Sequence, residues 1–284
     1  MATFPDIANL SPESQAAIER RVRAGMLRGY ADGTFKPFAN LTREQAALLL
    51  DRQSRWAIDK AAKFAKSTLS IFDYNYGTGA GFFVEDTSGM LHIITARHVI
   101  ATLYAINDNT TIWATNERRH LYVRAYWGLL RSDATDELIT ILTRQETTKE
   151  DLALLRITDK MRSLLPAEVP VIHLSGGDPE VGEDVVCIGS PLNFDNTVTT
   201  GKVARGCFEH YAHPGEWIFV SAGINPGNSG GPVFSVEDKT IGMALMKSWY
   251  RSAFGMAPVD DLGWVITAKA IRAWAKREWG LDLK

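Results

Sequence analysis

The 284-residue sequence has only two cysteines, a nearly balanced charge and no long apolar run, and each of these features excludes a class of protein. Cys187 and Cys207 cannot supply a disulfide framework, and we expect both to be free thiols. The formal net charge of −2 gives no reason to expect nucleic acid or an anionic membrane as a partner. No stretch approaches the roughly 20 apolar residues that span a bilayer, so no membrane span is expected. Neither His210 nor His213 has neighbouring ligands typical of a metal site, and we expect no metal and no other cofactor.

Residues 221–234 carry the strongest chemical signal, a glycine-rich turn around a serine. They read Ser-Ala-Gly-Ile-Asn-Pro-Gly-Asn-Ser-Gly-Gly-Pro-Val-Phe. A serine hydroxyl is a weak nucleophile that needs a neighbouring base and donors for the oxyanion formed on attack. The flanking glycines let the N–H groups of Gly227 and Ser229 aim at one point, with Asn228 between them. Ser229 is therefore a candidate nucleophile and residues 227–229 a candidate oxyanion hole, although a lone turn of this kind is more often structural.

Two further segments supply a histidine and an aspartate. Residues 93–99 form an apolar strand that runs into His98, and Asp151 opens another apolar strand. Each residue alone has an ordinary structural explanation, as a strand-end histidine or a strand-capping aspartate. The order His, Asp, Ser is nevertheless that of the chymotrypsin-like catalytic triad. The conjunction predicts Ser229 as nucleophile, His98 as general base and acid, and Asp151 as the group that orients the imidazole.

The sequence resembles the trypsin-like serine proteases, in particular their high-temperature-requirement (Deg-type) branch, over residues 67–276. The segments that carry the resemblance are Gly77–Val84, Ile94–Val99, Asp151–Leu155, Ile188–Val203 and Ile224–Pro232. The resemblance implies a mainly β fold, with two six-stranded barrels and the triad in the cleft between them. It also implies a serine endopeptidase that works through an acyl-enzyme. No PDZ domain follows in this sequence, so we expect regulation or targeting by the N-terminal module or by a partner.

The spacing of apolar residues agrees with that fold. Short β-rich segments separated by polar or Gly/Pro turns predict all-β barrels. The predicted strands cover residues 81–84, 91–95, 111–114, 121–127, 152–157, 185–188, 197–203, 217–220, 232–234, 241–246 and 263–266. Apolar residues at helical intervals then predict a C-terminal helix over Thr267–Trp279. We expect an N-terminal module over residues 1–55, a helical linker over 56–66 and a protease domain over 67–284.

Two departures from the family pattern bear on mechanism. Asn228 stands where zymogen-activated relatives carry an aspartate, so activation by a new N-terminal ammonium is not expected. Leu245 stands where relatives usually carry a Ser or Thr that donates to the triad aspartate, which leaves Asp151 with one donor fewer. This loss motivates a second hypothesis: a non-enzymatic scaffold or attachment protein with a poorly assembled triad.

The substrate pocket is predicted from the resemblance. Its candidate residues are Gly223, Ile224, Met243, Ala244 and Met246. No carboxylate stands at the base of this pocket, which favours a small or medium apolar P1 residue. Asp260 and Asp261 keep a basic preference open, and the methionines fit equally well as core fillers.

Residues 4–55 predict a separate helix–loop–helix module. Ser11 caps a first helix with Pro12 at its first position, a turn-rich loop covers 29–37, and Thr42 opens a second helix. The module resembles a single S-layer homology repeat, a unit that binds secondary cell-wall polymers and usually occurs in threes. A unit this short has little interior of its own, so it is expected to pack on the protease domain, on two further copies in a homotrimer, or on a partner protein. A helical cap with a prodomain-like role is the remaining alternative.

The sequence leaves the compartment open. Residues 1–6 lack the basic start and apolar core of a signal peptide, and free thiols favour a reducing interior. The S-layer-like module instead favours a cell surface or a virion.

Overall fold

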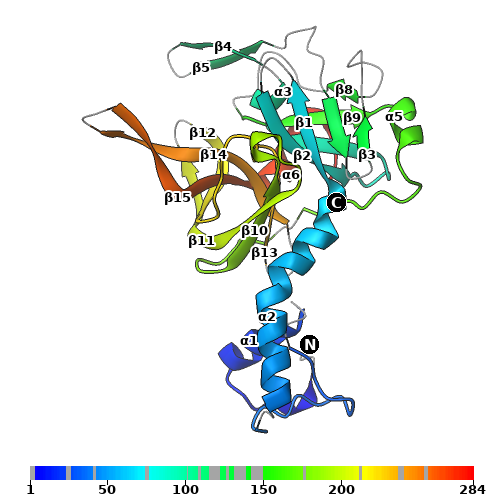
Figure 1. The fold of residues 1–284 in the computed structure, drawn as a ribbon, viewed down its shortest axis with the longest axis vertical. Coiled ribbons are helices and arrows are strands. Elements are labelled where there is room, and N and C mark those ends of the chain that lie inside the picture. Colours follow the sequence, from blue (N-terminus) through cyan, green and yellow to red (C-terminus); the bar gives the residue numbers. More distant parts are fainter. Residues whose placement is uncertain are drawn as a thin grey trace. The chain divides into compact units, whose positions relative to one another are not determined.

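The computed structural model describes residues 4–23, 27–40, 43–73, 77–100, 102–107, 110–114, 122–125, 128–130, 139–141, 150–174, 177–210, 213–235, 240–252 and 255–284. The chain forms two compact units. One consists mainly of Met1–Lys60, and the other of Ala61–Ser235 together with Lys239–Lys284 (Figure 1).

The N-terminal unit holds two helices and a loop that is tied to the start of the chain. A 3₁₀ turn η1 (Pro5–Ile7) precedes α1 (Pro12–Arg23), and α2 (Arg43–Phe64) begins after the loop. Ser11 Oγ accepts the Ser14 N–H at 3.2 Å and so caps α1, as the sequence predicts. The Asp6 carboxylate accepts the N–H groups of Phe35 and Lys36, at 2.9 and 2.6 Å. These bonds hold the loop in place in a unit with few buried side chains.

The larger unit begins with an antiparallel sheet. After η2 (Ala65–Ser67), its strands run in the order β7-β6-β1-β2-β3-β9-β8. Their bounds are β1 (Thr68–Asp73), β2 (Gly77–Glu85), β3 (Leu91–Thr95), β6 (Tyr122–Ala125), β7 (Gly128–Leu130), β8 (Ile139–Ile141) and β9 (Ala153–Ile157). The family resemblance predicts six strands here, whereas the described residues form seven, because the short β6, β7 and β8 extend both edges. A separate hairpin joins β4 (Thr102–Asn107) to β5 (Thr110–Ala114).

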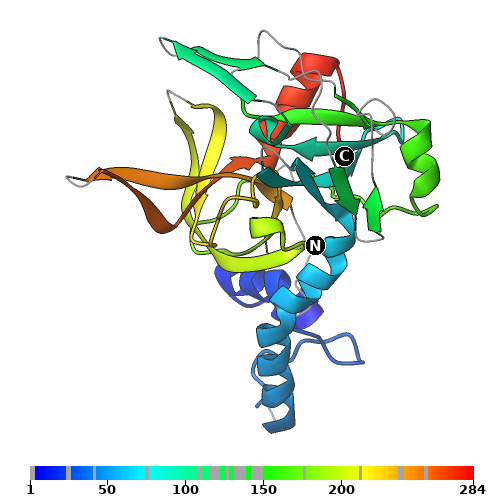
Figure 2. The ribbon, with the colours of Figure 1, turned by 45° about the horizontal axis from the view of Figure 1, so that its top comes forward.

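The second half of this unit is a closed six-stranded barrel, as predicted, in the order β10-β11-β12-β15-β14-β13. Its strands are β10 (Asp184–Gly189), β11 (Thr197–His210), β12 (His213–Val220), β13 (Pro232–Ser235), β14 (Thr240–Ser252) and β15 (Gly255–Thr267). The hairpin β14–β15 stays paired as far as Ser252 and Gly255 and extends away from the barrel (Figure 2). Among the described residues of this unit, one apolar cluster packs with the seven-stranded sheet and a second lies in the closed barrel, so the unit is mainly β.

Two helices of this unit follow the last strand of each half. A short α5 (Asp159–Leu164) follows β9, and α6 (Ala268–Trp279) confirms the predicted C-terminal helix. Thr267 Oγ1 accepts the Ala270 N–H at 3.1 Å and caps α6, which buries Ile271 and Trp274. Beyond the helix, Asp282 O accepts the Thr87 N–H at 2.9 Å, so the C-terminal residues bind the turn between β2 and β3. Within the described residues, no helix combines the length and the apolar character that crossing a membrane requires.

Candidate active site

His98 and Asp151 meet where two neighbouring strands end and begin. His98 follows β3 at the start of α3 (Arg97–Ile100), and Asp151 lies just before β9. Because β3 and β9 are antiparallel, with Thr95 opposite Ala153, the end of one lies beside the start of the other. His98 Nδ1 lies 2.5 Å from Asp151 Oδ2, and the His98 backbone N–H donates to Asp151 Oδ1 at 2.9 Å. These two contacts fix both the imidazole and the carboxylate.

The charge of Asp151 governs the chemistry of His98. Burial lowers the pKa of His98, but the negative charge of Asp151 and the hydrogen bond to it outweigh burial, and the pKa rises above 6.5. An ionised carboxylate has no proton to donate, so Nδ1 carries the hydrogen and Nε2 keeps its lone pair. Nε2 can therefore accept a proton. The neighbouring Arg97 is fully buried, and desolvation lowers its pKa while Asp151 opposes that shift.

The turn that contains Ser229 is hydrogen-bonded to the first sheet. The Ala80 N–H, on β2, donates to Ser229 O at 2.8 Å. Gly230 has φ +90°, and a Cβ there would overlap the Ala80 carbonyl oxygen, so only glycine fits. Gly230 is thus required by this close approach to the first sheet, whereas a Cβ at Gly231 would overlap Ile188 O on β10 of its own barrel.

The Ser229 hydroxyl is directed at β14. It donates to Leu245 O at 2.9 Å. Within the described part of the chain, no hydrogen bond joins Ser229 to His98. The structure thus pairs His98 with Asp151 directly, whereas the serine hydroxyl is bonded to a backbone carbonyl.

Of the three backbone amides in the candidate oxyanion hole, one is hydrogen-bonded within the turn and two are not, in the part of the chain that the structure describes. The Asn228 N–H donates to Asn225 O at 2.9 Å, so this amide is used within the turn. Among the described hydrogen bonds, neither the Gly227 N–H nor the Ser229 N–H takes part in the turn. The buried Asn228 side chain donates from Nδ2 to Gly223 O at 3.1 Å, which ties the turn to the segment before it.

The predicted pocket residues lie partly in the core. Ile224 and Ala244 belong to the apolar cluster of the second barrel, and Met243 is fully buried. Gly223 and Met246 are partly exposed. The side chains of Asp260 and Asp261 lie outside the described residues, and the composition of the pocket stays a prediction.

The trypsin-like peptidase domain family matches residues 79–243, a stretch that contains His98, Asp151 and Ser229. The chain belongs to the trypsin-like peptidase family. Residues 3–47 of the same chain match the S-layer homology domain, which agrees with the resemblance of the N-terminal module.

Several curated proteases are similar to this trypsin-like peptidase. The probable periplasmic serine endoprotease DegP-like of Hahella chejuensis is 33% identical over 168 residues, 58% of this chain and 29% of the relative. Serine protease HTRA3 of Homo sapiens is 30% identical over 73% of this chain and 42% of its own length. Serine protease HTRA1A of Danio rerio is 40% identical over 70% of this chain and 36% of its own length. The chain thus spans well under half the length of these relatives.

Solved structures support the fold of this peptidase. The Rv3671c protease in its inactive form aligns with a TM-score of 0.54 at 19% identity, over 78% of this chain and 93% of that one. The serine endoprotease from Yersinia pestis aligns with the same TM-score and identity, over 78% of this chain and 66% of that one. At this level of identity the likeness establishes the double-barrel fold.

One polar contact near the nucleophile turn of this peptidase is absent from the sequence predictions. Ser70 Oγ, on β1, bonds to Ser190 Oγ and donates to Asp195 Oδ1. Ser70 is more than a hundred residues from both partners in the chain, and although Ser190 and Asp195 lie in a family motif, nothing in the sequence links them to Ser70.

Both cysteines are free, as predicted, and one of them lies in a possible ligand cluster. Asp178, Cys207 and Glu216 offer ligand atoms within 4.8 Å of one another, the one such group among the described residues. Burial and the two carboxylates raise the pKa of Cys207 to about 11, so its thiol is protonated at neutral pH. Lys269 Nζ lies 3.1 Å from Glu216 and 3.9 Å from Asp178, so one positive charge is shared between the two carboxylates. The cluster contains no triad residue, and the expectation of no metal stays a prediction.

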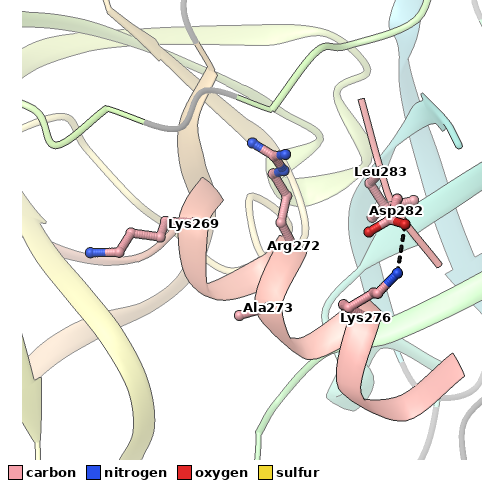
Figure 3. A pocket seen from close by; sticks show the side chains of 6 residues that line it. All are labelled: Lys269, Arg272, Ala273, Lys276, Asp282 and Leu283. Atoms are coloured by element: carbon pink, nitrogen blue, oxygen red, sulfur yellow. Dashed lines mark hydrogen bonds and ion pairs between the residues drawn. The ribbon is translucent and has the colours of Figure 1, made fainter. Parts of the chain in front are cut away.

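A groove of about 420 Å³ crosses α6 of this peptidase (Figure 3). It is lined by Lys269, Arg272, Ala273, Lys276, Asp282 and Leu283. Lys276 Nζ binds Asp282 at 2.6 Å, and Lys269 is engaged by Glu216. Two of its three cations are therefore already neutralised within the chain.

Proposed function

We propose that this trypsin-like peptidase is a serine endopeptidase that cleaves protein substrates through an acyl-enzyme. Ser229 is the nucleophile, His98 the general base and acid, and Asp151 the group that orients the imidazole. The observation that carries the proposal is the hydrogen bond between His98 Nδ1 and Asp151 Oδ2 at 2.5 Å, which leaves Nε2 as a base. The similarity to a relative named as a probable serine endoprotease and to another named as a serine protease supports the same conclusion.

The chemistry follows the usual course for such a triad. Ser229 Oγ attacks the scissile carbonyl carbon while its proton passes to His98 Nε2, and the Gly227 and Ser229 N–H groups stabilise the oxyanion. His98 then protonates the leaving amine, and water hydrolyses the acyl-enzyme by the same proton route. Before attack the hydroxyl must leave Leu245 O and turn toward His98 Nε2.

The proposed specificity is for a small or medium apolar P1 residue. Gly223 and Met246 are the partly exposed members of the candidate pocket, and Ile224 is an apolar neighbour. A basic P1 preference, through Asp260 or Asp261, is the competing proposal. A library of peptides that differ only at P1 separates the two, because Lys and Arg would rank first in the second case.

A second candidate function is a scaffold or attachment protein on a protease fold. The observation in its favour is the Ser229 hydroxyl, which donates to Leu245 O and makes no hydrogen bond to His98 within the described residues. Leu245, where relatives usually carry a Ser or Thr that donates to the triad aspartate, also favours this function. In this case substrate-like reagents would not react with the folded chain.

We propose that the N-terminal unit targets the protease to a cell-wall polymer or to a partner protein. The support is its match to the S-layer homology domain and a groove of about 380 Å³ within this unit. The groove is lined by Leu27, Arg28, Gly29, Tyr30, Phe35, Lys36, Pro37, Ala39, Gln45, Leu48 and Leu49. Pull-down of the full chain with purified cell walls tests the polymer, and no enrichment over a wall-free control would contradict it.

A homotrimer is the proposed assembly, in which three chains combine one repeat each with cyclic symmetry. Exposed apolar side chains of this unit, Phe38 at 87%, Leu48 at 47% and Ile58 at 61%, supply contact surface. Light scattering of the full chain at tens of micromolar tests it, since a monomer would contradict the trimer.

The test of the enzymatic proposal is Ser229→Ala. Removal of a triad nucleophile costs on the order of 10⁶ in kcat, whereas loss of one hydroxyl changes packing little. We expect hydrolysis of a denatured protein substrate to cease while the unfolding midpoint stays unchanged. Equal cleavage by the wild type and the variant would contradict the assignment.

A further inference from the structure

The loop after β10 contacts Gly227 of the candidate oxyanion hole directly. It follows β10 and includes η3 (Pro191–Asn193). The Ser190 N–H donates to Gly227 O at 3.1 Å. Gly227 has φ +103°, and a Cβ there would overlap Ser190 O and Pro191 Cα. This hydrogen bond and the close approach of the two backbones couple the position of Gly227 to that of the loop.

This loop is held from the first sheet. Ser70 Oγ bonds to Ser190 Oγ and donates to Asp195 Oδ1. Because a serine hydroxyl has a single hydrogen, Ser70 gives its hydrogen to Asp195 and accepts that of Ser190. Ser70 and Ser190 are 3% and 1% exposed, so the bond between the two hydroxyls is sheltered from water, whereas the Asp195 side chain is exposed. Ser70 also lies opposite Ala80, whose N–H holds Ser229 O, so one strand pair supports both the nucleophile and the loop.

The loop needs such a restraint because its backbone is strained. Leu192 has φ 53°, in the left-handed region where a bulky side chain is an outlier, whereas Asn196, at φ 54°, is a residue type that tolerates this region. The Leu192 side chain is 78% exposed and adds little packing to hold this conformation. Within the loop, the Phe194 N–H donates to Pro191 O at 2.9 Å and Thr197 Oγ1 to Phe194 O at 2.8 Å, and the bonds with Ser70 add a restraint from outside the loop.

We propose that Ser70, Ser190 and Asp195 are positioning residues that fix the Gly227 N–H for the oxyanion. This inference rests on the proposed endopeptidase function. The network runs from the Asp195 carboxylate through the two hydroxyls and the Ser190 backbone to Gly227, and it touches neither substrate nor the proton path. Its loss therefore lowers transition-state stabilisation and leaves ground-state binding largely unchanged.

The test uses Ser70→Ala and Asp195→Ala in the full chain, with kcat and KM measured separately on a fluorogenic peptide. Misplacement of an oxyanion donor by a fraction of its bond length is costly, and we expect kcat to fall by about 10-fold to 100-fold with KM within about twofold. Asp195→Asn keeps an acceptor oxygen for Ser70 and should recover most of kcat. Ser88→Ala is the matched control, because it removes a serine-to-carboxylate bond of 2.6 Å, to Asp86, at the turn between β2 and β3. Its kcat should equal that of the wild type.

The outcomes separate this inference from the function on which it rests. If the wild type reacts with a fluorophosphonate and both alanine variants keep its kcat, the network has no positioning role and the endopeptidase stands. A rise in KM at constant kcat would also overturn the inference. If the folded wild type hydrolyses nothing and reacts with no fluorophosphonate, both conclusions fall together. Should Ser70→Ala not fold, the exposed Asp195 still allows the comparison of Asp195→Ala with Asp195→Asn.

Discussion

Replacement of Asp86 by asparagine should destabilise the protease unit in a way that depends on pH. Asp86 lies at the turn between β2 and β3 and is 4% exposed. Its Oδ1 accepts the N–H and Oγ–H of Ser88, at 2.8 and 2.6 Å, and the Met90 N–H at 3.0 Å, while Oδ2 lies 3.0 Å from His92 Nε2. Asparagine keeps the shape and one oxygen of this side chain but loses the negative charge. Its amide N–H₂ replaces the other oxygen and meets a group that donates to the Asp86 carboxylate.

The magnitude follows from the pKa of Asp86. Burial raises this pKa, but the hydrogen bonds from Ser88, His92 and Met90 outweigh burial and lower it from 3.8 to about 2. At roughly 1.4 kcal/mol per pKa unit, the ionised form contributes about 2 kcal/mol to the free energy of unfolding. Because the folded pKa is lowered, this contribution is fully present above pH 3.8 and is lost as the pH falls through about 2.

Urea denaturation at pH 7, and in steps down to pH 3, measures this difference. We expect Asp86→Asn to lower the free energy of unfolding by about 2 kcal/mol at pH 7, and the gap to narrow below pH 4. The control is Asp282→Asn, which removes an exposed ion pair with Lys276 and should cost less than about 1 kcal/mol. A variant as stable as the wild type at pH 7, or a gap that does not change with pH, would refute the reasoning.

Three further predictions concern catalysis. Because Asp151 raises the pKa of His98, kcat/KM should fall on the acid side with a midpoint above 6.5, and a midpoint at or below that value in a pH–rate profile would argue against the pairing. Asp151→Asn should reduce kcat by about 10⁴-fold in steady-state assays, and a loss under tenfold would show that another group orients the imidazole. EDTA should leave the rate unchanged; inhibition that zinc or calcium reverses would instead reveal an essential metal.

The sequence predicts those elements of the fold whose pattern is local. The strand over 91–95 has the predicted bounds, and the C-terminal helix ends at Trp279 as predicted but begins at Ala268, one residue later than predicted, because Thr267 is its cap. β1 (Thr68–Asp73) is missed, since it follows a helical pattern directly and no turn signal separates the two. β14 and β15 are each predicted too short, because beyond the barrel their pairing is set by the partner strand and not by burial.

In the candidate site, too, the sequence predicts only what a local motif marks. The order of His98, Asp151 and Ser229 predicts the triad residues from three short motifs, and two of them are hydrogen-bonded to each other in the structure. The direction of the Ser229 hydroxyl is not predictable from sequence, because it depends on a backbone carbonyl of β14. The contact of Ser70 with Ser190 depends on how two barrels pack, and neither segment alone contains that information.

The central claim is that Ser229 is an activated nucleophile, and reaction with a fluorophosphonate tests it most directly. The reagent forms a phosphorus–oxygen bond only with a serine that has a base and an oxyanion site. Incubation of the full chain, followed by peptide mass spectrometry, locates the modified residue. The account predicts stoichiometric modification at Ser229 that is lost in His98→Ala. A folded wild-type chain that stays unmodified, or one modified elsewhere to the same extent in Ser229→Ala, would contradict it.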